Sequence, residues 1–531
     1  MFSNFKKVYQ VLSQKEKTTL FLNVAVFAVS ASLLSIIFFL AVTEKTPIAG
    51  GRWREGIIGQ PVFINPAVSN NDADQEIGRL IFAGLGDLGS IKSEAEGLQW
   101  TVRLNEQLFW QDGQEITSDD IIFTIQTILN PESRSPLFQG LEGVIVDRVS
   151  ELEIKFTLPS PYAFFETTLK NLRPFPRHIW ENIPVANFDL SRHTLEPIGS
   201  GPYKFASYKK ERDGFISEYR LIRNKNFVGK APYINEIIIK LFPDENELIA
   251  AYNQGRIDGF MINNPHALPE IKLRHQVNQL SASRYFAVFI NQSLQPEFKK
   301  SELRRLLHQI TPREKIVEQA LKNFGRPINS PFLDFGEKTS LEEKTQEENF
   351  ETKISLVPQD DQLFTVNLVV PDSPTLIKTA EILRQSWKQA GINLNINTLS
   401  PFEIFKAIRK RNYELFLFGN TLSEPQDLYS FWHSRNRFYP GLNLSLYRNS
   451  RADLLIEKIR SEPDSEERLS YLQELISIFE TNIPAVFLYS SDYLYITSPR
   501  LRGFEKDAVV VPADRFDQIS SWYVKTGRKL K

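Results

Sequence analysis

The strongest pattern along the chain is an uncharged run near its amino terminus. From Leu20 to Val42, 23 consecutive residues carry no charge, and most of them are apolar. A helix needs about 20 apolar residues to cross a hydrocarbon layer of roughly 30 Å. The run therefore predicts one transmembrane helix over residues 20–42, and no other stretch of the sequence has an uninterrupted apolar run of that length.

The charges before this run predict how the helix is oriented. Four lysines and one glutamate precede it, namely Lys6, Lys7, Lys15, Lys17 and Glu16. Because basic residues accumulate on the cytoplasmic side of a membrane, residues 1–19 are expected in the cytoplasm and the body after residue 42 outside it, periplasmic or extracellular. A cleaved signal peptide is the alternative, but its apolar region usually has about 7–15 residues, fewer than this run. A buried core helix is a third, weaker option.

After the run, short strand patterns alternate with helical ones. Residues 99–110 alternate as a strand does, the Asp112-Gly113 pair predicts a hairpin turn, and Thr117 or Ser118 can cap a helix over the next twelve residues. Between residues 364 and 420, three apolar strands are separated by two helical segments, which predicts a βαβαβ unit with right-handed crossovers. The pattern as a whole predicts an α/β fold.

Composition removes several classes of function. The 63 basic and 64 acidic residues leave a net charge of -1, which gives no basic surface for nucleic acid, and none is expected as a partner. The chain has no cysteine, so disulfides, thiolate metal sites, cysteine nucleophiles and lipid attachment at cysteine are excluded. The six histidines form no H-E-x-x-H, and no phosphate-binding loop or G-x-S-x-G occurs. We therefore expect no enzyme activity, no metal site and no cofactor.

Five segments, in order, resemble one family of receptors. The first two are WQDGQEITSDDIIFTI (110–125) and IGSGPYKF (198–205), whose two glycines are interpreted as turn residues. The third is the segment 224–258, which ends in Gly-Arg-Ile-Asp. The last two are YFAVFINQ with the arginine-rich helix after it, and the helix pair over 450–489. In this order they are similar to the family 5 solute-binding proteins of ATP-binding cassette (ABC) importers, the peptide and nickel receptor group. The resemblance covers roughly residues 57–505.

The resemblance implies a fold and a domain order. The fold is a two-lobed α/β fold of the periplasmic-binding-protein kind (type II, cluster C-like), with an extra inserted domain and one preceding transmembrane helix. The expected order is a cytoplasmic segment (1–19), the transmembrane helix (20–42), a tether (43–56), lobe I (57–85, 186–280 and 486–531 with the carboxyl-terminal tail), an inserted small domain (86–185) and lobe II (281–485).

The ligand is expected where strand ends of both lobes face a cleft. The third strand of the βαβαβ unit delivers Asn420, Thr421, Leu422, Ser423 and Glu424 to such an edge. In similar peptide receptors this loop supplies an aspartate that pairs with the α-ammonium of the peptide, and here Thr421 stands near that place. A hydroxyl cannot offset burial of an ammonium as a carboxylate does. Other candidates, which can equally be packing residues, are Asn263, Asn264, Phe402 and Tyr489.

These features together predict a binding function. The expected protein is an extracytoplasmic receptor that closes two lobes around a peptide, a peptide-like solute or another small solute, and delivers it to the permease subunits of an ABC importer. Two alternatives stay open. One is a membrane-anchored receptor or sensor for a non-peptide solute, and the other is a hydrolase that reuses the cleft through a hidden pair of carboxylates.

Overall fold

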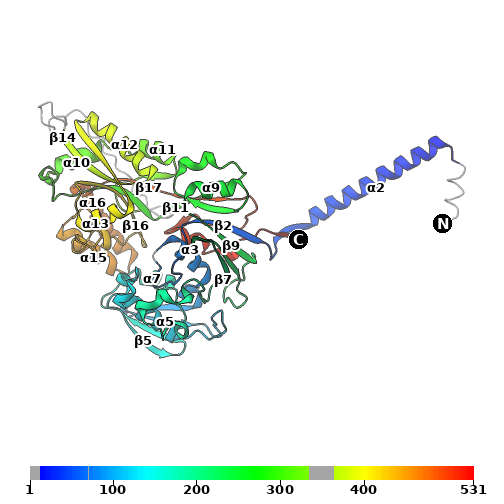
Figure 1. Cartoon of the computed structure of the whole chain (residues 1–531), viewed down its shortest axis with the longest axis horizontal. Helices are drawn as coiled ribbons and strands as arrows, with labels where there is room; N and C mark the ends of the chain where they lie inside the picture. The colour runs from blue at the N-terminus through cyan, green and yellow to red at the C-terminus, as the bar shows by residue number, and fades with distance from the viewer. Residues whose placement is uncertain (1–11, 70, 334–363, 531) are drawn as a thin grey trace.

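The computed structural model describes residues 12–69, 71–333 and 364–530. A long helix, α2 (Gln14–Val42), projects away from a body that holds almost all the rest of the chain (Figure 1). Ser13 begins the helix with a capping box, since its side chain and that of Glu16 each accept from the other's backbone N–H. None of the helix is buried, and it is long and apolar enough to cross a membrane. Residues 1–11 of the expected cytoplasmic segment lie outside the described part.

A two-stranded ribbon joins this helix to the body. β1 (Thr43–Pro47) follows α2 directly and pairs antiparallel with β20 (Thr526–Leu530), so both ends of the body meet at the helix. β2 (Arg52–Ile58) then enters a large sheet, with Trp53 fully buried. The segment 43–56, expected as a tether, is therefore mostly strand, because its residues find pairing partners far away in the sequence.

The largest sheet has eight strands. Their order is β19 (Ala508–Val509), β11 (Gln276–Ala282), β18 (Tyr493–Thr497), β10 (Gly259–Ile262), β2, β9 (Glu236–Phe242), β8 (Ile216–Arg223) and β7 (Tyr203–Lys210). Helices α3 (Asp72–Ile81) and α9 (Glu245–Asn253) pack against it. Both are capped by polar side chains, Asn71 and Asp244, which accept from backbone N–H groups of the first turn.

A second, six-stranded sheet contains the βαβαβ unit. Its order is β13 (Gly325–Pro327), β17 (Ala485–Ser491), β12 (Arg284–Ile290), β16 (Leu415–Thr421), β14 (Phe364–Pro371) and β15 (Ile392–Leu399). β14 pairs in parallel with both β15 and β16, which confirms the prediction for this unit. The helices of this part are α10 (Ser301–Gln309), α11 (Arg313–Leu321), α12 (Pro374–Gln389), α13 (Pro401–Lys410), α14 (Tyr429–Trp432), α15 (Ser450–Ser461) and α16 (Ser465–Asn482).

A third, four-stranded sheet lies within residues 89–157, inside the segment expected as an inserted domain. Its order is β3 (Gly89–Glu94), β4 (Gln99–Leu104), β6 (Glu153–Thr157) and β5 (Ile145–Ser150), and its helices are α4 (Leu85–Leu88), α5 (Ser118–Leu129), α6 (Phe138–Leu141), α7 (Phe165–Asn171) and α8 (Arg177–Trp180). Thr117, one of the two residues predicted as possible caps, caps α5 through a capping box with Asp120. In Figure 1 this part lies beside the eight-stranded sheet, on the side away from α9.

The chain passes between the eight-stranded and six-stranded sheets twice. β11 gives way to β12 at Ser283, and β17 gives way to β18 at Asp492. The first crossing is close to the lobe boundary expected between residues 280 and 281. The second falls after β17, although residues from 486 onward were expected in lobe I. β17 is fully buried and pairs with β12 and β13, which places it in the six-stranded sheet.

The glycines of IGSGPYKF permit a close approach rather than an unusual turn. Neither Gly199 nor Gly201 has a positive φ. Instead, Gly201 donates its N–H to the carbonyl of Ile81 at the end of α3, at 2.7 Å. A Cβ at Gly199 would lie 2.2 Å from that same carbonyl oxygen. The motif thus lets the start of β7 pack directly on the end of α3, one of the helices that borders the cleft.

Candidate ligand-binding cleft

A cavity of about 690 Å³ lies where the three sheet-containing parts meet. One wall comes from α3 and residues 506–517 beside the eight-stranded sheet. Another comes from residues 136–172 of the four-stranded part, and the third from residues 421–460 beyond β16. This volume is typical of a site that encloses a small ligand.

The loop after β16 forms the wall nearest the expected site. Thr421, Ser423 and Glu424 line the cavity, whereas Leu422 between them is fully buried. Leu422 donates its N–H to the Ser283 carbonyl at 2.7 Å and accepts from the Ser283 hydroxyl at 2.6 Å. The alternation of the strand continues into the loop, so the residues on either side of Leu422 face the cavity.

Glu424 is a partly buried carboxylate at the cavity wall. Burial raises the pKa of Glu424, a hydrogen bond with Thr167 of α7 lowers it, and the nearby charge of Asp427 raises it again. Among the described residues, Glu424 forms no ion pair. Because a buried carboxylate is stabilised by a cation more than by a hydroxyl, Glu424 is suited to meet a positively charged group in the cavity.

The opposite wall carries a cluster of paired charges. Arg79 of α3 forms ion pairs with Asp514 and with Asp517, the latter at 3.4 Å, and Lys506 lies 2.6 Å from Asp517. Behind them, burial and then the charge of Arg79 lower the pKa of Arg173 to about 9. The facing walls of the cavity thus carry both basic and acidic side chains.

A contact between the four-stranded part and the six-stranded part crosses the cleft. The Tyr162 hydroxyl donates to Asp427 at 2.9 Å, and Arg460 of α15 lies 3.1 Å from the same carboxylate. The Arg460 guanidinium also lies over the rings of Tyr162 and Tyr429, at 4.7 and 4.6 Å from their centroids. We call Tyr162, Asp427 and Arg460 the cleft bridge. A second cavity of about 520 Å³ lies on its other side and shares Tyr162 and Arg460 with the first.

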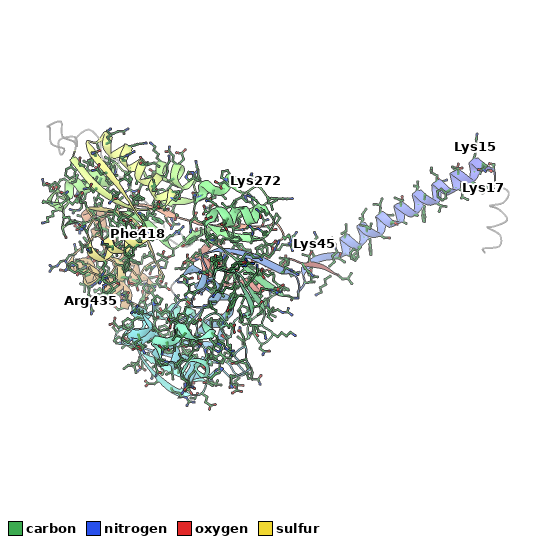
Figure 2. The ribbon with its side chains drawn as sticks, viewed as in Figure 1. Lys15, Lys17, Lys45, Lys272, Phe418 and Arg435 are labelled. Atoms are coloured by element: carbon green, nitrogen blue, oxygen red, sulfur yellow. The ribbon has the colours of Figure 1, made fainter. Side chains whose placement is uncertain are left out.

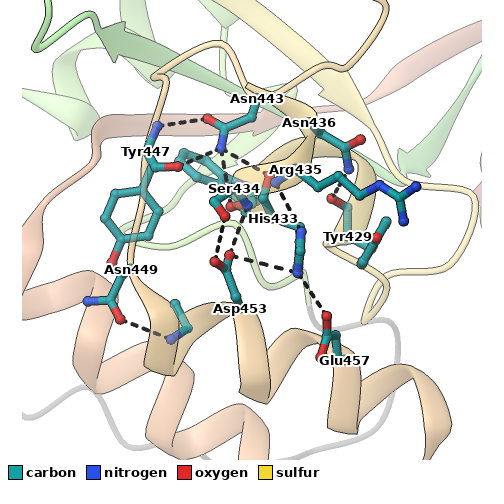
Figure 3. Close-up of polar contacts among 12 residues, drawn as sticks. Tyr429, His433, Ser434, Arg435, Asn436, Asn443, Tyr447, Asn449, Asp453 and Glu457 are labelled. Carbon is teal, nitrogen blue, oxygen red and sulfur yellow. Dashed lines mark hydrogen bonds and ion pairs between the residues drawn. The ribbon is translucent and has the colours of Figure 1, made fainter. Parts of the chain in front are cut away.

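The segment that carries Tyr429 is fixed to α15 by a polar cluster (Figure 3). His433 lies 3.1 Å from Glu457, and the Ser434 hydroxyl donates to Asp453 at 2.6 Å. Asn443 donates to three backbone carbonyls. These bonds hold the chain from residue 429 to residue 449 against the helix, so the wall of the cleft has a rigid support.

The other sequence candidates lie away from the two cavities. Asn420 is buried and donates to the Tyr285 hydroxyl at 2.8 Å. Tyr489 is fully buried and stacks on Phe286, while Phe402 is 76% exposed on α13. Asn263 and Asn264 follow β10, where Asn264 caps a short helical turn by accepting from His266. None of these five lines either cavity.

Sequence reasoning did not find Arg79, Tyr162, Asp427, Arg460 or Asp514. They come from five separate segments, each within an ordinary charged or aromatic context. Only the packing of the three parts brings them together. Of these residues, only Asp427 could be suspected from its position in the sequence, because it closely follows the loop predicted to face the ligand.

Comparison with known proteins identifies the family. Residues 88–438 match the family described as bacterial extracellular solute-binding proteins, family 5 Middle. The chain belongs to this family. Family 5 solute-binding proteins are extracytoplasmic receptors of ABC transporters and not enzymes, so the chain is an ABC transporter solute-binding protein.

Individual proteins are similar to this chain over most of their length. The oligopeptide-binding protein AppA of Bacillus subtilis is 24% identical over 498 residues, which cover 86% of this chain and 90% of AppA. The ABC transporter substrate-binding protein CtaP of Listeria monocytogenes superposes with a TM-score of 0.78 at 25% identity, covering 90% of this chain and 99% of CtaP. NikZ of Campylobacter jejuni, in complex with Ni(L-His), gives a TM-score of 0.71 at 22% identity over 89% and 99% of the two chains.

Proposed function

We propose that this solute-binding protein is a membrane-anchored receptor for a peptide or peptide-like solute, which it delivers to the permease subunits of an ABC importer. The observation that carries the proposal is the cavity of about 690 Å³ between the three parts, in a chain of this family. Its walls offer both acidic and basic side chains, as a ligand with an ammonium and a carboxylate group requires. The oligopeptide-binding relative supports a ligand of this class.

Thr421, Ser423 and Glu424 are the residues we propose to contact the ligand. All three line the cavity, whereas Asn420 and Leu422 are held in the protein interior by Tyr285 and Ser283. Glu424 supplies the carboxylate that Thr421 lacks. In this arrangement the ligand cation pairs with Glu424. On the facing wall, the ligand's anionic group competes with Asp514 and Asp517 for Arg79 and Lys506.

The two crossings between sheets are the proposed hinge. Ser283 is almost fully buried and bonded both to Leu422 beyond β16 and, through its N–H, to Val509 of β19. Closure of the lobes about Ser283 and Asp492 would enclose the cavity. A ligand shifts the equilibrium between the open and closed forms only by the difference between its affinities for the two forms.

A screen of ligands tests the function. The full chain in detergent is mixed with a peptide pool, and a bound solute is identified by mass spectrometry of the material that co-purifies. We expect a peptide to raise the thermal midpoint by mass action, by an amount that grows with peptide concentration. If no peptide raises the thermal midpoint and no peptide-like solute co-purifies, the peptide proposal fails.

Glu424→Gln tests the proposed cation site. We expect the affinity for a free-amine peptide to fall by about 10- to 100-fold, because a charge-assisted contact is lost. Glu318→Gln, at an exposed position of α11, is the matched control. An N-acetylated peptide should bind both variants equally. If the parent chain and Glu424→Gln bind the free-amine peptide equally, Glu424 does not contact the ligand cation. The proposed receptor function would stand.

A receptor or sensor for a non-peptide solute is the second candidate. The hydroxyl of Thr421, in place of the carboxylate expected in similar peptide receptors, favours it. NikZ, of similar fold, is described with Ni(L-His). The same thermal assay with Ni(II) and histidine separates the two candidates, since only this alternative gives a response to the chelate with none to peptides.

A further inference from the structure

The carboxyl-terminal strand returns to the end of the membrane-spanning helix. In the ribbon of β1 and β20, Leu530 lies opposite Thr43, the residue after α2, and Arg528 lies opposite Lys45. The Arg528 guanidinium donates to the Thr43 hydroxyl at 2.8 Å and lies 5.7 Å from the centroid of the Phe39 ring. Phe39 belongs to the last turns of α2. Arg528 therefore lies at the level where the apolar helix ends, although it is about 490 residues further along the chain.

The ribbon carries more basic than acidic side chains. Lys45, Arg528 and Leu530 are exposed on one face of the ribbon, whereas Lys529 lies directly opposite the exposed acid Glu44 on the other face. Lys45 and Arg528 are directly opposite each other, and like charges in such a pair destabilise a sheet unless an anion or water lies between them. Leu530, next to them, is 71% exposed. An exposed apolar residue beside exposed basic residues is typical of a surface that contacts the interface of a membrane.

Figure 2 shows how these charges lie relative to α2. Lys15 and Lys17 are at the far end of the helix, and Lys45 is at the end next to the body. The apolar part of α2 separates the two groups. When α2 spans a bilayer, the ribbon must then lie at the outer surface, with Arg528 and Leu530 at the depth of the headgroups.

We propose that one face of the ribbon, defined by Lys45, Arg528 and Leu530, binds the phosphate groups of anionic phospholipids in the membrane that α2 crosses. The proposal rests on the membrane anchoring proposed above. The two cations pair with lipid phosphates while Leu530 enters the interface. The body is thereby held at a fixed orientation to the membrane surface, instead of moving freely on its helix.

The absence of cysteine in the chain makes a direct test possible. Leu530→Cys, labelled with an environment-sensitive fluorophore, reports the environment of the ribbon in the full chain. Lys272→Cys, on the body away from α2, is the control position (Figure 2). Each labelled protein is reconstituted into vesicles of phosphatidylcholine alone or mixed with phosphatidylglycerol. Quenching by acrylamide is then measured at low and high salt.

We expect the label at position 530 to be about twofold less quenched in the vesicles with phosphatidylglycerol, and the difference to vanish at high salt. The label at position 272 should not change. Lys45→Gln with Arg528→Gln should abolish the protection, while Lys299→Gln with Lys300→Gln, an exposed pair far from the ribbon, should leave it intact. Equal quenching at position 530 in both lipids overturns the proposal.

Failure of the anchor gives a different result. A chain without α2 does not float with the vesicles at all, and its intact mass shows the cleavage. A chain that floats in both lipids but shows no lipid-dependent protection keeps the anchor and rejects the contact between the ribbon and the lipid.

Discussion

Arg515 is a fully buried charge at the centre of an ion-pair cluster. Its side chain is fully buried and forms ion pairs with Glu55 at 2.8 Å and Glu76 at 2.5 Å. Tyr495 and Trp53 donate to the other oxygen of Glu55. Burial lowers the pKa of Arg515, but the two glutamates raise it more, so the guanidinium stays charged. These contacts join β2 to α3 and to the segment 512–516, and Arg79 of α3 and Asp514 of that segment line the cavity.

We expect Arg515→Met to lower the free energy of unfolding by about 3–5 kcal/mol, because two buried carboxylates lose their cation. Urea denaturation of the full chain in detergent measures this. Arg212→Met, in the exposed turn between β7 and β8, should change the free energy of unfolding by less than about 0.5 kcal/mol. An equal effect of both substitutions would mean that the buried ion pairs contribute no stability.

His308 should make stability depend on pH. Burial, and then the charge of Arg313, lower the pKa of His308 to about 3, and Arg313 donates to its ring nitrogen at 3.0 Å. The folded protein therefore holds this imidazole neutral while the unfolded chain takes up a proton near pH 6.5. The stability that His308 contributes is complete above that pH and is lost as the pH falls from about 6.5 toward 3.

Between pH 6.5 and pH 5, the parent chain should lose about 2 kcal/mol more unfolding free energy than His308→Gln. Urea titrations at the two pH values test this. His275→Gln, near the surface, should behave as the parent does. If His308→Gln shows the parent's full pH dependence, other groups are responsible for it.

At the scale of elements, the cleft depends on where strands end and helices begin. β16 ends at Thr421, and the loop after it faces the cavity because β16 pairs between β12 and β14. The sequence predicts this unit and its edge. It cannot predict the second wall, because α3 approaches the cleft through its contact with Gly199 and Gly201 and the segment 506–517 pairs far from its sequence neighbours.

The cleft bridge gives a prediction at this scale. Tyr162→Phe removes the hydrogen bond to Asp427 and should shift the balance between closed and open forms toward open by about tenfold. Small-angle scattering without ligand should then show a larger radius of gyration. Tyr208→Phe, on β7, is the matched control. Identical scattering from the parent and Tyr162→Phe would show that this hydrogen bond does not hold the cleft.

At the scale of the whole molecule, the receptor body is joined to α2 at both ends of its chain. β1 and β20 make one ribbon, so cleavage near Ala41 would leave β1 at a new terminus. We expect the helix to be retained. The protein extracted from membranes should have the full mass of 61.2 kDa, measured by intact mass spectrometry. A mature form that begins near residue 42 and is found outside the membrane fraction would contradict this.

The sequence by itself determined the family, the α/β alternation, the βαβαβ unit and the long apolar helix. These follow from local periodicity, caps and ordered motifs, which act between residues close along the chain. The tertiary structure alone decided which side chains face the cleft, the place of β17 in the six-stranded sheet, and the pairing of the two ends in a ribbon. Those outcomes depend on contacts between residues hundreds of positions apart, and single-chain periodicity carries no information about them.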